Sequence, residues 1–249
     1  MSIIQETFTL PSHGKIYDCA VSETVTLRSM DTEDEMRRLS PSITPYKSMC
    51  DLIDGCTMND VGISSYDMCM GDYQFLLYKL RIVTYGPEYL NSSICPFCGN
   101  ENISKKDLDK LAVQEWTEDY QSQLELELPV SKKKVTLKFL TPRDLDDIEK
   151  QKMDFARNNP DYKFDLSVLY NLKKSILLID GKRYDYVKLE NFLRKLPMKD
   201  TNILLQTATK LNDRIGLDAS FEETCKNPKC ELTYRSTFRL TTEFFRPTI

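Results

Sequence analysis

The chain has 249 residues, of which 41% are hydrophobic and 29% are charged, with only 8 glycines and 11 prolines. This composition is typical of a folded protein with an adequate core and excludes a disordered or low-complexity chain. The formal net charge is −4, so no nucleic-acid footprint is visible at the level of net charge. The amino terminus has no basic region followed by an apolar run, and no apolar stretch approaches about 18 residues, so we expect a cytosolic protein without a membrane span.

The first predicted elements are a hairpin and a capped helix. Residues 9–17 (TLPSHGKIY) place a Leu-Pro pair and a polar turn before residues 25–28 (VTLR), which alternate as a half-buried strand does. Asp31 or Thr32 can then cap a helix whose first turn carries the acids of residues 31–35 (DTEDE). Because acids at this position complement the helix dipole, we interpret them as structural rather than catalytic.

Two helices and a cysteine pair complete this unit. A short helix is expected near residues 46–56 and a longer one in residues 70–86, where apolar residues recur at helical spacing. Gly86 is suited to a left-handed cap at the end of the longer helix. Cys95 and Cys98 follow in the sequence CPFC, and Gly99 permits the positive φ that a metal-binding knuckle needs.

The same order of elements returns later in the chain. Residues 135–146 (VTLKFLTPRDLD) match residues 25–36 (VTLRSMDTEDEM), with Thr141 as the cap and Pro142 at the first helical position. Residues 124–129 (LELELP) alternate as the strand that opens a second hairpin. The acids that follow Pro142 lie in a first helical turn and again have a structural interpretation.

The segments between these landmarks differ in length. Residues 105–116 are expected to begin as a linking helix capped by Ser104. Residues 165–179 and 184–196 are expected to form two amphipathic helices separated by an Asp-Gly turn.

A second long helix is predicted in residues 198–216 and ends at Gly216. Cys225 and Cys230 then follow in the sequence CKNPKC. Cys225 lies as many positions after Gly216 as Cys95 lies after Gly86.

The sequence therefore predicts an α+β fold that contains an internal repeat. We expect two pseudo-symmetric, helix-rich halves, residues 1–104 and residues 105–249, packed as one unit and each opening with a small β-hairpin. A shared four-cysteine site resembling a zinc ribbon would join them.

The four paired cysteines predict a structural zinc site. Two short-spaced pairs of thiolates are the ligand set that zinc prefers in such sites, which places the ion between Cys95, Cys98, Cys225 and Cys230. The pairs are much further apart than the usual spacing of about 15–20 residues, so reduced buried thiols and a redox dithiol stay open as alternatives. The other four cysteines are expected to be small buried hydrophobic residues, and they are Cys19, Cys50, Cys56 and Cys69.

No enzymatic activity is predicted. His13 is the only histidine and lies in a predicted turn, which excludes most histidine-dependent catalysis, and no phosphate-binding glycine loop is present.

The carboxyl-terminal segment has two interpretations. It either completes the sheet that bears the cysteines, or it docks on a partner through Phe244, Phe245 and Arg246, residue types that anchor interfaces.

Several stretches in this order resemble one known family. LPSHGKIY, VTLRSMDTEDEM, LYKLRIVTYG, CPFCG and the terminal FFRP together are similar to the baseplate hub assembly proteins of T-even-type contractile-tailed bacteriophages, over essentially the whole chain. The length is closest to that of the family member described as the hub assembly catalyst. The resemblance implies a non-enzymatic assembly chaperone in the host bacterial cytoplasm, with other baseplate hub proteins as partners.

Two other functions stay open at this stage. The protein could be a stoichiometric structural subunit of the hub. It could also be a zinc-stabilised nucleic-acid-binding protein, although nucleic acid is not an expected partner; a basic face would then come from residues 226–229 (KNPK), Arg235, Arg239 and Arg246.

Overall fold

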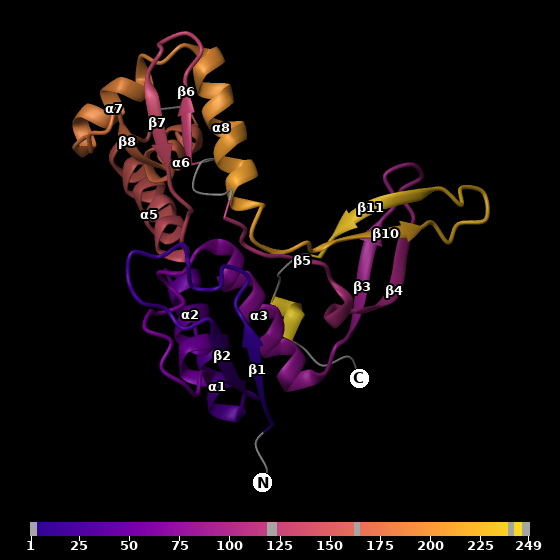
Figure 1. Cartoon of the computed structure of the whole chain (residues 1–249). Coiled ribbons are helices and arrows are strands. Elements are labelled where there is room, and N and C mark those ends of the chain that lie inside the picture. Colours follow the sequence, from indigo (N-terminus) through magenta and orange to yellow (C-terminus); the bar gives the residue numbers. More distant parts are fainter. Residues whose placement is uncertain (1–3, 119–123, 162–164, 239–241, 246–249) are drawn as a thin grey trace.

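The computed structural model describes residues 4–118, 124–161, 165–238 and 242–245. It has an α+β fold with small antiparallel sheets, as predicted. Figure 1 shows three parts: a first lobe drawn mainly in indigo, a second lobe drawn mainly in orange and pink, and a projecting ribbon made of hairpins from distant parts of the chain. No helix in the described ranges is long and apolar enough to span a membrane.

The first lobe is built as the sequence predicts. Its elements are β1 (Gln5–Thr9), β2 (Thr24–Arg28), α1 (Thr32–Leu39), α2 (Pro45–Cys56) and α3 (Met70–Tyr85). The strands are antiparallel with Phe8 opposite Val25, and both side chains are buried. Asp31 caps α1 in a capping box with Asp34, which confirms the predicted helix start. Asp31 and Asp34 therefore cap the start of α1, which is a structural role.

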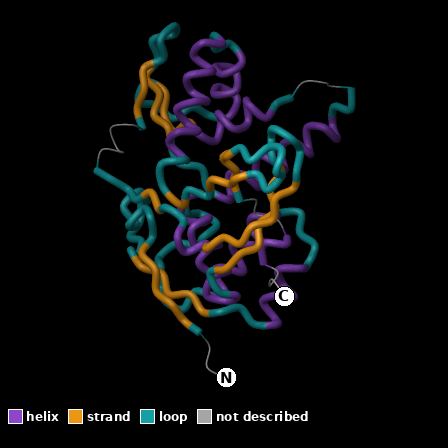
Figure 2. Tube along the Cα trace, turned by 90° about the vertical axis from the view of Figure 1, so that its right-hand side faces the viewer, coloured by secondary structure: helices purple, strands orange, loops and turns teal. Residues whose placement is uncertain are grey.

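The second lobe has its own sheet and helices. Its elements are β6 (Glu125–Glu127), β7 (Lys134–Leu137), α5 (Pro142–Asn158), α6 (Ser167–Ser175), β8 (Ile176–Ile179), α7 (Tyr186–Arg194) and α8 (Met198–Asn212). The strands form one antiparallel sheet in the order β6-β7-β8. Thr141 caps α5 with Pro142 in the first turn, as predicted. In the view turned by 90°, the strands of this lobe lie on one side and its helices on the other (Figure 2).

One predicted helix of this lobe is wrong in its last part. The helix expected over residues 165–179 ends at Ser175, and residues 176–179 form β8 instead. Val135 of β7 pairs with Ile179 of β8, and both side chains are buried. Pairing with β7 and burial of the side chains therefore stabilise this apolar segment as a strand more than a further helical turn would.

The ribbon is formed by two hairpins. Its strands are β3 (Glu88–Ile94), β4 (Glu101–Asp107), β10 (Ser220–Thr224) and β11 (Thr233–Thr237). The linking helix expected over residues 105–116 is wrong. Residues 101–107 pair with β3 instead, and only the short 3-10 helix η1 (Leu108–Lys110) follows. Alternate residues of an antiparallel strand, here Ser104 and Lys106, direct their backbone groups at the partner strand, so pairing with β3 uses groups that the predicted helix would have used.

The ends of the two long helices differ. Helix α3 ends at Gly86, as predicted, and this C-cap has a positive φ of 83°; its ψ of 170° is extended, so the predicted left-handed conformation is not formed. Gly216 does not cap α8, which ends at Asn212 with Asp213 as its C-cap. Instead Gly216 belongs to β9 (Gly216–Leu217), which pairs with β5 (Val113–Gln114) between the lobes and the ribbon. The glycine is needed there for a close contact with α3 rather than for a helix end.

The two lobes meet where α2 and α5 pack together. Asp146 of α5 is buried and accepts the backbone N–H groups of Tyr46 (3.3 Å) and Lys47 (2.8 Å) in the first turn of α2. Since α2 has no side-chain cap of its own, the second lobe supplies it. Arg143 adds a two-pronged ion pair with Asp67, with N–O distances of 2.6 and 2.8 Å.

Candidate metal centre

The first cysteine knuckle lies in the tight turn between β3 and β4. Cys95 is buried and Cys98 is exposed. The backbone N–H of Gly99 donates to the carbonyl of Cys95 (2.9 Å), and Gly99 has φ 74°, the conformation expected from the sequence. The N–H of Asn100 points at the Cys98 sulfur and is the main cause that lowers the pKa of this thiol to about 7.

The second knuckle lies between β10 and β11. The backbone N–H of Cys230 donates to the carbonyl of Asn227 (2.9 Å), which closes the turn. Backbone N–H groups two residues further on again point at the sulfurs, from Asn227 to Cys225 and from Leu232 to Cys230. Such donors stabilise thiolates, and thiolates are the form that binds metal.

The structure brings all four predicted ligands together. The four sulfur atoms lie within 4.8 Å of one another, with Cys98 3.5 Å from Cys225 and Cys95 3.9 Å from Cys230. A tetrahedral zinc ion with Zn–S bonds of about 2.3 Å separates its sulfurs by about 3.8 Å. A disulfide needs sulfurs about 2 Å apart, so these are free thiols spaced as a metal would space them.

The ionisation of the thiols depends on their neighbours. The Leu232 N–H favours the thiolate of Cys230, but burial and the three other sulfurs outweigh it and raise the pKa of Cys230 to about 12. Burial likewise raises the pKa of Cys225. A thiolate at Cys98 therefore makes ionisation of the neighbouring thiols less favourable. A bound cation would neutralise this repulsion and allow all four to ionise.

A buried polar network surrounds the cysteines on the inner side of the ribbon. The hydroxyl of Tyr234 bonds with the hydroxyl of Ser93 (2.8 Å) and accepts from the amide of Asn102 (2.9 Å). The Asn102 carbonyl oxygen accepts the N–H of Lys226 beside Cys225 (2.7 Å). Sequence reasoning missed these residues, because a buried Asn or Ser in a strand has no distinguishing pattern in a single sequence.

This interior contributes little hydrophobic stabilisation. Within the described residues, the apolar cluster around the sulfurs consists of Tyr234 and three of the cysteines, whereas each lobe has a large apolar core. Below a minimum core size, small domains usually depend on metals or disulfides. The donor set, its spacing and its polar surroundings all fit a structural metal ion.

Comparison with known proteins identifies the family. A family model described as "T4 bacteriophage base plate protein" matches residues 1–246. The chain belongs to this family. No curated protein and no solved structure matches it significantly. The resemblance seen in the sequence to phage baseplate proteins is thereby confirmed at the level of the family.

The carboxyl-terminal aromatic residues of this baseplate protein lie inside the first lobe. Phe244 and Phe245 belong to the 3-10 helix η2 (Thr242–Phe245), and their exposed fractions are 1% and 3%. Phe244 packs against Tyr78 of α3 with ring centroids 4.8 Å apart. In this fold the two rings therefore complete the chain's own core instead of forming surface anchors. Arg246, the third residue of the predicted partner contact, lies outside the described residues.

Buried Arg81 holds this segment in place. Its guanidinium donates to the carbonyl of Phe244 (3.0 Å), and also to those of Gly86 (2.6 Å) and Glu88 (3.0 Å). Burial lowers the pKa of Arg81. One side chain thus ties α3, the start of β3 and the carboxyl-terminal segment together.

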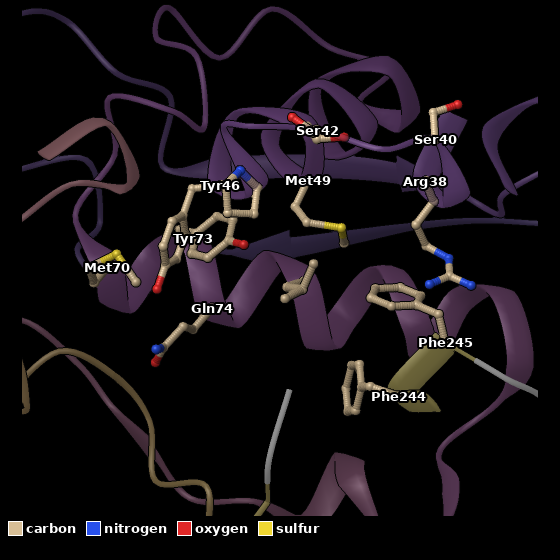
Figure 3. A pocket seen from close by; sticks show the side chains of 13 residues that line it. Arg38, Ser40, Ser42, Tyr46, Met49, Met70, Tyr73, Gln74, Phe244 and Phe245 are labelled. Carbon is tan, nitrogen blue, oxygen red and sulfur yellow. The ribbon is translucent and has the colours of Figure 1, made fainter. Parts of the chain in front are cut away.

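A cavity of about 450 Å³ opens beside Phe244 and Phe245, between α2 and α3 (Figure 3). Tyr46, Met49 and Tyr73 contribute to its lining, which is mainly apolar and aromatic. Its cation, Arg38, stacks over the Phe245 ring at 5.5 Å and bonds with Glu35. This arrangement suits packing of apolar groups, and the described residues of the lining include no nucleophile beside a general base.

The other residues considered in the sequence are the four remaining cysteines and His13. Cys50, Cys56 and Cys69 are buried as predicted, whereas Cys19 is exposed, which corrects the prediction for that residue. His13 lies in its turn with φ 52° and is only partly exposed. Its ring nitrogens lie 2.6 Å from Glu23 and 3.4 Å from Glu115. The carboxylate of Glu23 raises the pKa of His13.

Proposed function

We propose that this baseplate protein assists assembly of the central baseplate hub through protein contacts, in the host bacterial cytoplasm, and is not an enzyme. We also propose that Cys95, Cys98, Cys225 and Cys230 hold one structural zinc ion. Membership of the baseplate family over nearly the whole chain supports the role. The cluster of four sulfurs carries the proposal of the ion, because it brings together two cysteine pairs that are distant in sequence.

We further propose that the two lobes derive from one duplicated unit. Asp72, the third residue of α3, accepts the N–H of Ser12 (3.0 Å) in the turn after the first Leu-Pro pair. Asp200, the third residue of α8, accepts the N–H groups of Val130 (2.9 Å) and Ser131 (2.8 Å) after the second Leu-Pro pair. Both carboxylates are fully buried and perform the same task.

Two more pairs of contacts support the duplication. Arg28 bonds to Asp34 at the capping box of α1 (2.6 Å), as Lys138 does to Asp144 at that of α5 (2.5 Å).

The N–H of Met30 donates to Thr84 near the end of α3 (3.1 Å), as that of Leu140 donates to Asn212 at the end of α8 (2.8 Å). Thr84 and Asn212 have the same separation in sequence as Asp72 and Asp200. The helices therefore correspond in this register, which differs from the one that pairs Gly86 with Gly216.

The boundary between the halves follows from this correspondence. Residues 104 and 105 both lie inside β4, so we place the boundary after that strand rather than after residue 104. The carboxyl-terminal segment returns to the first lobe, where Phe238, Phe244 and Phe245 join its core. We propose two halves that are bound to each other at the ribbon and at this returning segment.

The nucleic-acid alternative is less well supported by the described basic residues. Arg235 is paired with Asp218 (3.1 Å), and Lys226 donates to the backbone carbonyl of Ile103. These intramolecular contacts engage the positively charged groups that would otherwise bind the phosphates of a nucleic acid. Arg239 and Arg246 lie outside the described residues.

Quantitative mass spectrometry of infected cells and of purified phage tests the assembly role. An assembly factor is present with hub proteins in free complexes and is depleted from finished particles. A fixed stoichiometry in finished particles would instead establish the structural-subunit alternative. Metal analysis of the purified chain in the same preparation should find one zinc per chain.

A further inference from the structure

The hairpin of β3 and β4 carries three exposed apolar residues among polar ones on its outward face, whereas its inward face has buried polar residues. Leu90, Ile94 and Ile103 point outward, with exposed fractions of 47%, 70% and 49%. Asn91 and Asn102 point inward and are buried. In antiparallel hairpins with one face in water, the apolar residues normally face the core. The reversed pattern leaves an apolar surface that no described part of the chain covers.

The other hairpin of the ribbon has an outward face of the opposite character. Ile94 precedes Cys95 as Thr224 precedes Cys225, and Thr224, Thr233 and Arg235 are exposed polar residues. The ribbon therefore does not require apolar residues on its outside. Contiguous exposed apolar residues of this kind mark interaction surfaces.

The residues of this outward face are arranged to complement a second copy of the same face. In the strand register, Ser92 lies opposite Ile103, Leu90 opposite Lys105 and Ile94 opposite Glu101. Two such faces can stack against each other about a two-fold axis that lies between them, perpendicular to the strands, at the Ser92–Ile103 pair. Each Lys105 then lies over a Glu101, each Leu90 over an Ile94, and Ile103 over its own counterpart.

We propose that the outward face of the β3–β4 hairpin binds a second copy of this chain in that two-fold arrangement. Leu90, Ile94 and Ile103 then meet apolar residues, and Lys105 and Glu101 meet opposite charges, as a self-complementary interface requires. Lys105 already pairs with Glu88 (2.6 Å), but both side chains are more than 60% exposed, so the ammonium is free to be shared.

The face is small, which sets the strength of the dimer. Two strands of seven residues cover a length of about 24 Å and a width of about 10 Å. The area that these two dimensions enclose is well below the roughly 800 Å² that each partner contributes to a typical stable interface. The dimer is therefore weak and concentration-dependent, and its ion pairs make it sensitive to salt.

Charge exchange provides a direct test by sedimentation velocity over roughly a hundredfold range of protein concentration. The parent chain shows a reversible monomer–dimer equilibrium. Glu101→Lys and Lys105→Glu each place like charges opposite one another twice, and each variant loses the dimer. An equimolar mixture of the two variants restores it, as does the double variant E101K/K105E.

Control variants separate this interface from general effects of charge. Thr224→Lys and Thr233→Glu on the outward face of β10 and β11 leave the dimer unchanged, whereas Ile94→Ser weakens it. Circular dichroism shows that each variant is folded, since all of these positions are exposed. A parent that stays monomeric throughout, single variants that associate like the parent, or a mixture that fails to recover would each overturn the proposal. A monomeric parent that binds another baseplate protein through Ile94 would assign this face to that partner instead. None of these outcomes depends on whether the protein remains in the finished particle.

Discussion

Gly71 in the first turn of α3 lies directly against Gly216 of β9. A Cβ atom on Gly216 would lie 2.7 Å from the Cα of Gly71, and one on Gly71 would lie 2.0 Å from the carbonyl oxygen of Ile215. Both distances are shorter than contacts between real Cβ atoms and their neighbours. The long helix of the first lobe therefore meets the strand that follows the second lobe with backbone against backbone.

This contact predicts opposite effects of the same substitution at two helical glycines. Gly71→Ala should destabilise the protein by about 2 kcal/mol or more in chemical denaturation, because backbone atoms must move. Gly55→Ala in α2 has its nearest neighbour at 3.9 Å and should be neutral or stabilising by up to about 1 kcal/mol. Equal effects of both substitutions would contradict this account of the contact.

Removal of the proposed ion should unfold the ribbon selectively. Chelation, or Cys98→Ser, should expose the amides of β3, β4, β10 and β11 to hydrogen exchange, while the cores of the two lobes stay protected. Cys19→Ser is the matched control, since Cys19 is a free and exposed thiol that lies outside the cluster. This variant should bind as much metal as the parent. A chain that binds no metal and keeps a protected ribbon would refute the proposed ion.

Asp146 predicts how strongly the lobes depend on each other. Asp146→Ala removes the cap of α2 and should lower the free energy of unfolding by about 1–3 kcal/mol. Asp51→Ala removes a carboxylate that is 59% exposed and that, among the described residues, forms an ion pair with Lys47 alone, so the free energy of unfolding should change by less than about 0.5 kcal/mol. Urea denaturation measures both, and a cost at Asp51 as large as that at Asp146 would speak against the cap.

Arg81 predicts the stability of the carboxyl-terminal segment. Arg81→Met leaves three carbonyl groups without their donor, among them that of buried Phe244, so we expect a loss of about 3 kcal/mol and faster proteolysis of the carboxyl-terminal segment. Arg37→Met removes a guanidinium that is 62% exposed and whose one ion pair within the described ranges is with Glu33 on its own helix, so it should change neither stability nor proteolysis appreciably. If the segment stayed protected in the Arg81 variant, the three hydrogen bonds would not be what holds it.

His13 predicts a pH dependence of stability. Glu23 raises the pKa of His13 above its ordinary value of 6.5, so the charged ring stabilises the folded state. This contribution is fully present below pH 6.5 and is lost as the pH rises through the higher pKa of the folded state. NMR titration should find that raised pKa, and His13→Gln should remove the corresponding loss of stability as the pH rises above 6.5. A folded-state pKa at or below 6.5 would contradict the close contact between His13 and Glu23.

Local signals in the sequence were sufficient wherever the interactions themselves are local. The caps at Asp31 and Thr141 form between residues three apart, so the pattern of acids and hydroxyls predicts both helix starts. The knuckle at Gly99 follows in the same way from the Cys-x-x-Cys-Gly order. Long-range partners decided the rest. The apolar residues 176–179 suit a helix or a strand equally well, and the free edge of β7 selects the strand.

The sequence by itself determined the α+β class, the repeated order of hairpin, capped helix and long helix, and the two cysteine pairs, because each depends on spacing within a few residues. Only the tertiary structure decided that the four sulfurs meet, that Asp146 caps a helix of the other lobe, and that the Phe244 and Phe245 rings are buried beside Arg81. These contacts join residues far apart in the chain. Their energies arise from burial and hydrogen bonding in three dimensions, which no local pattern encodes.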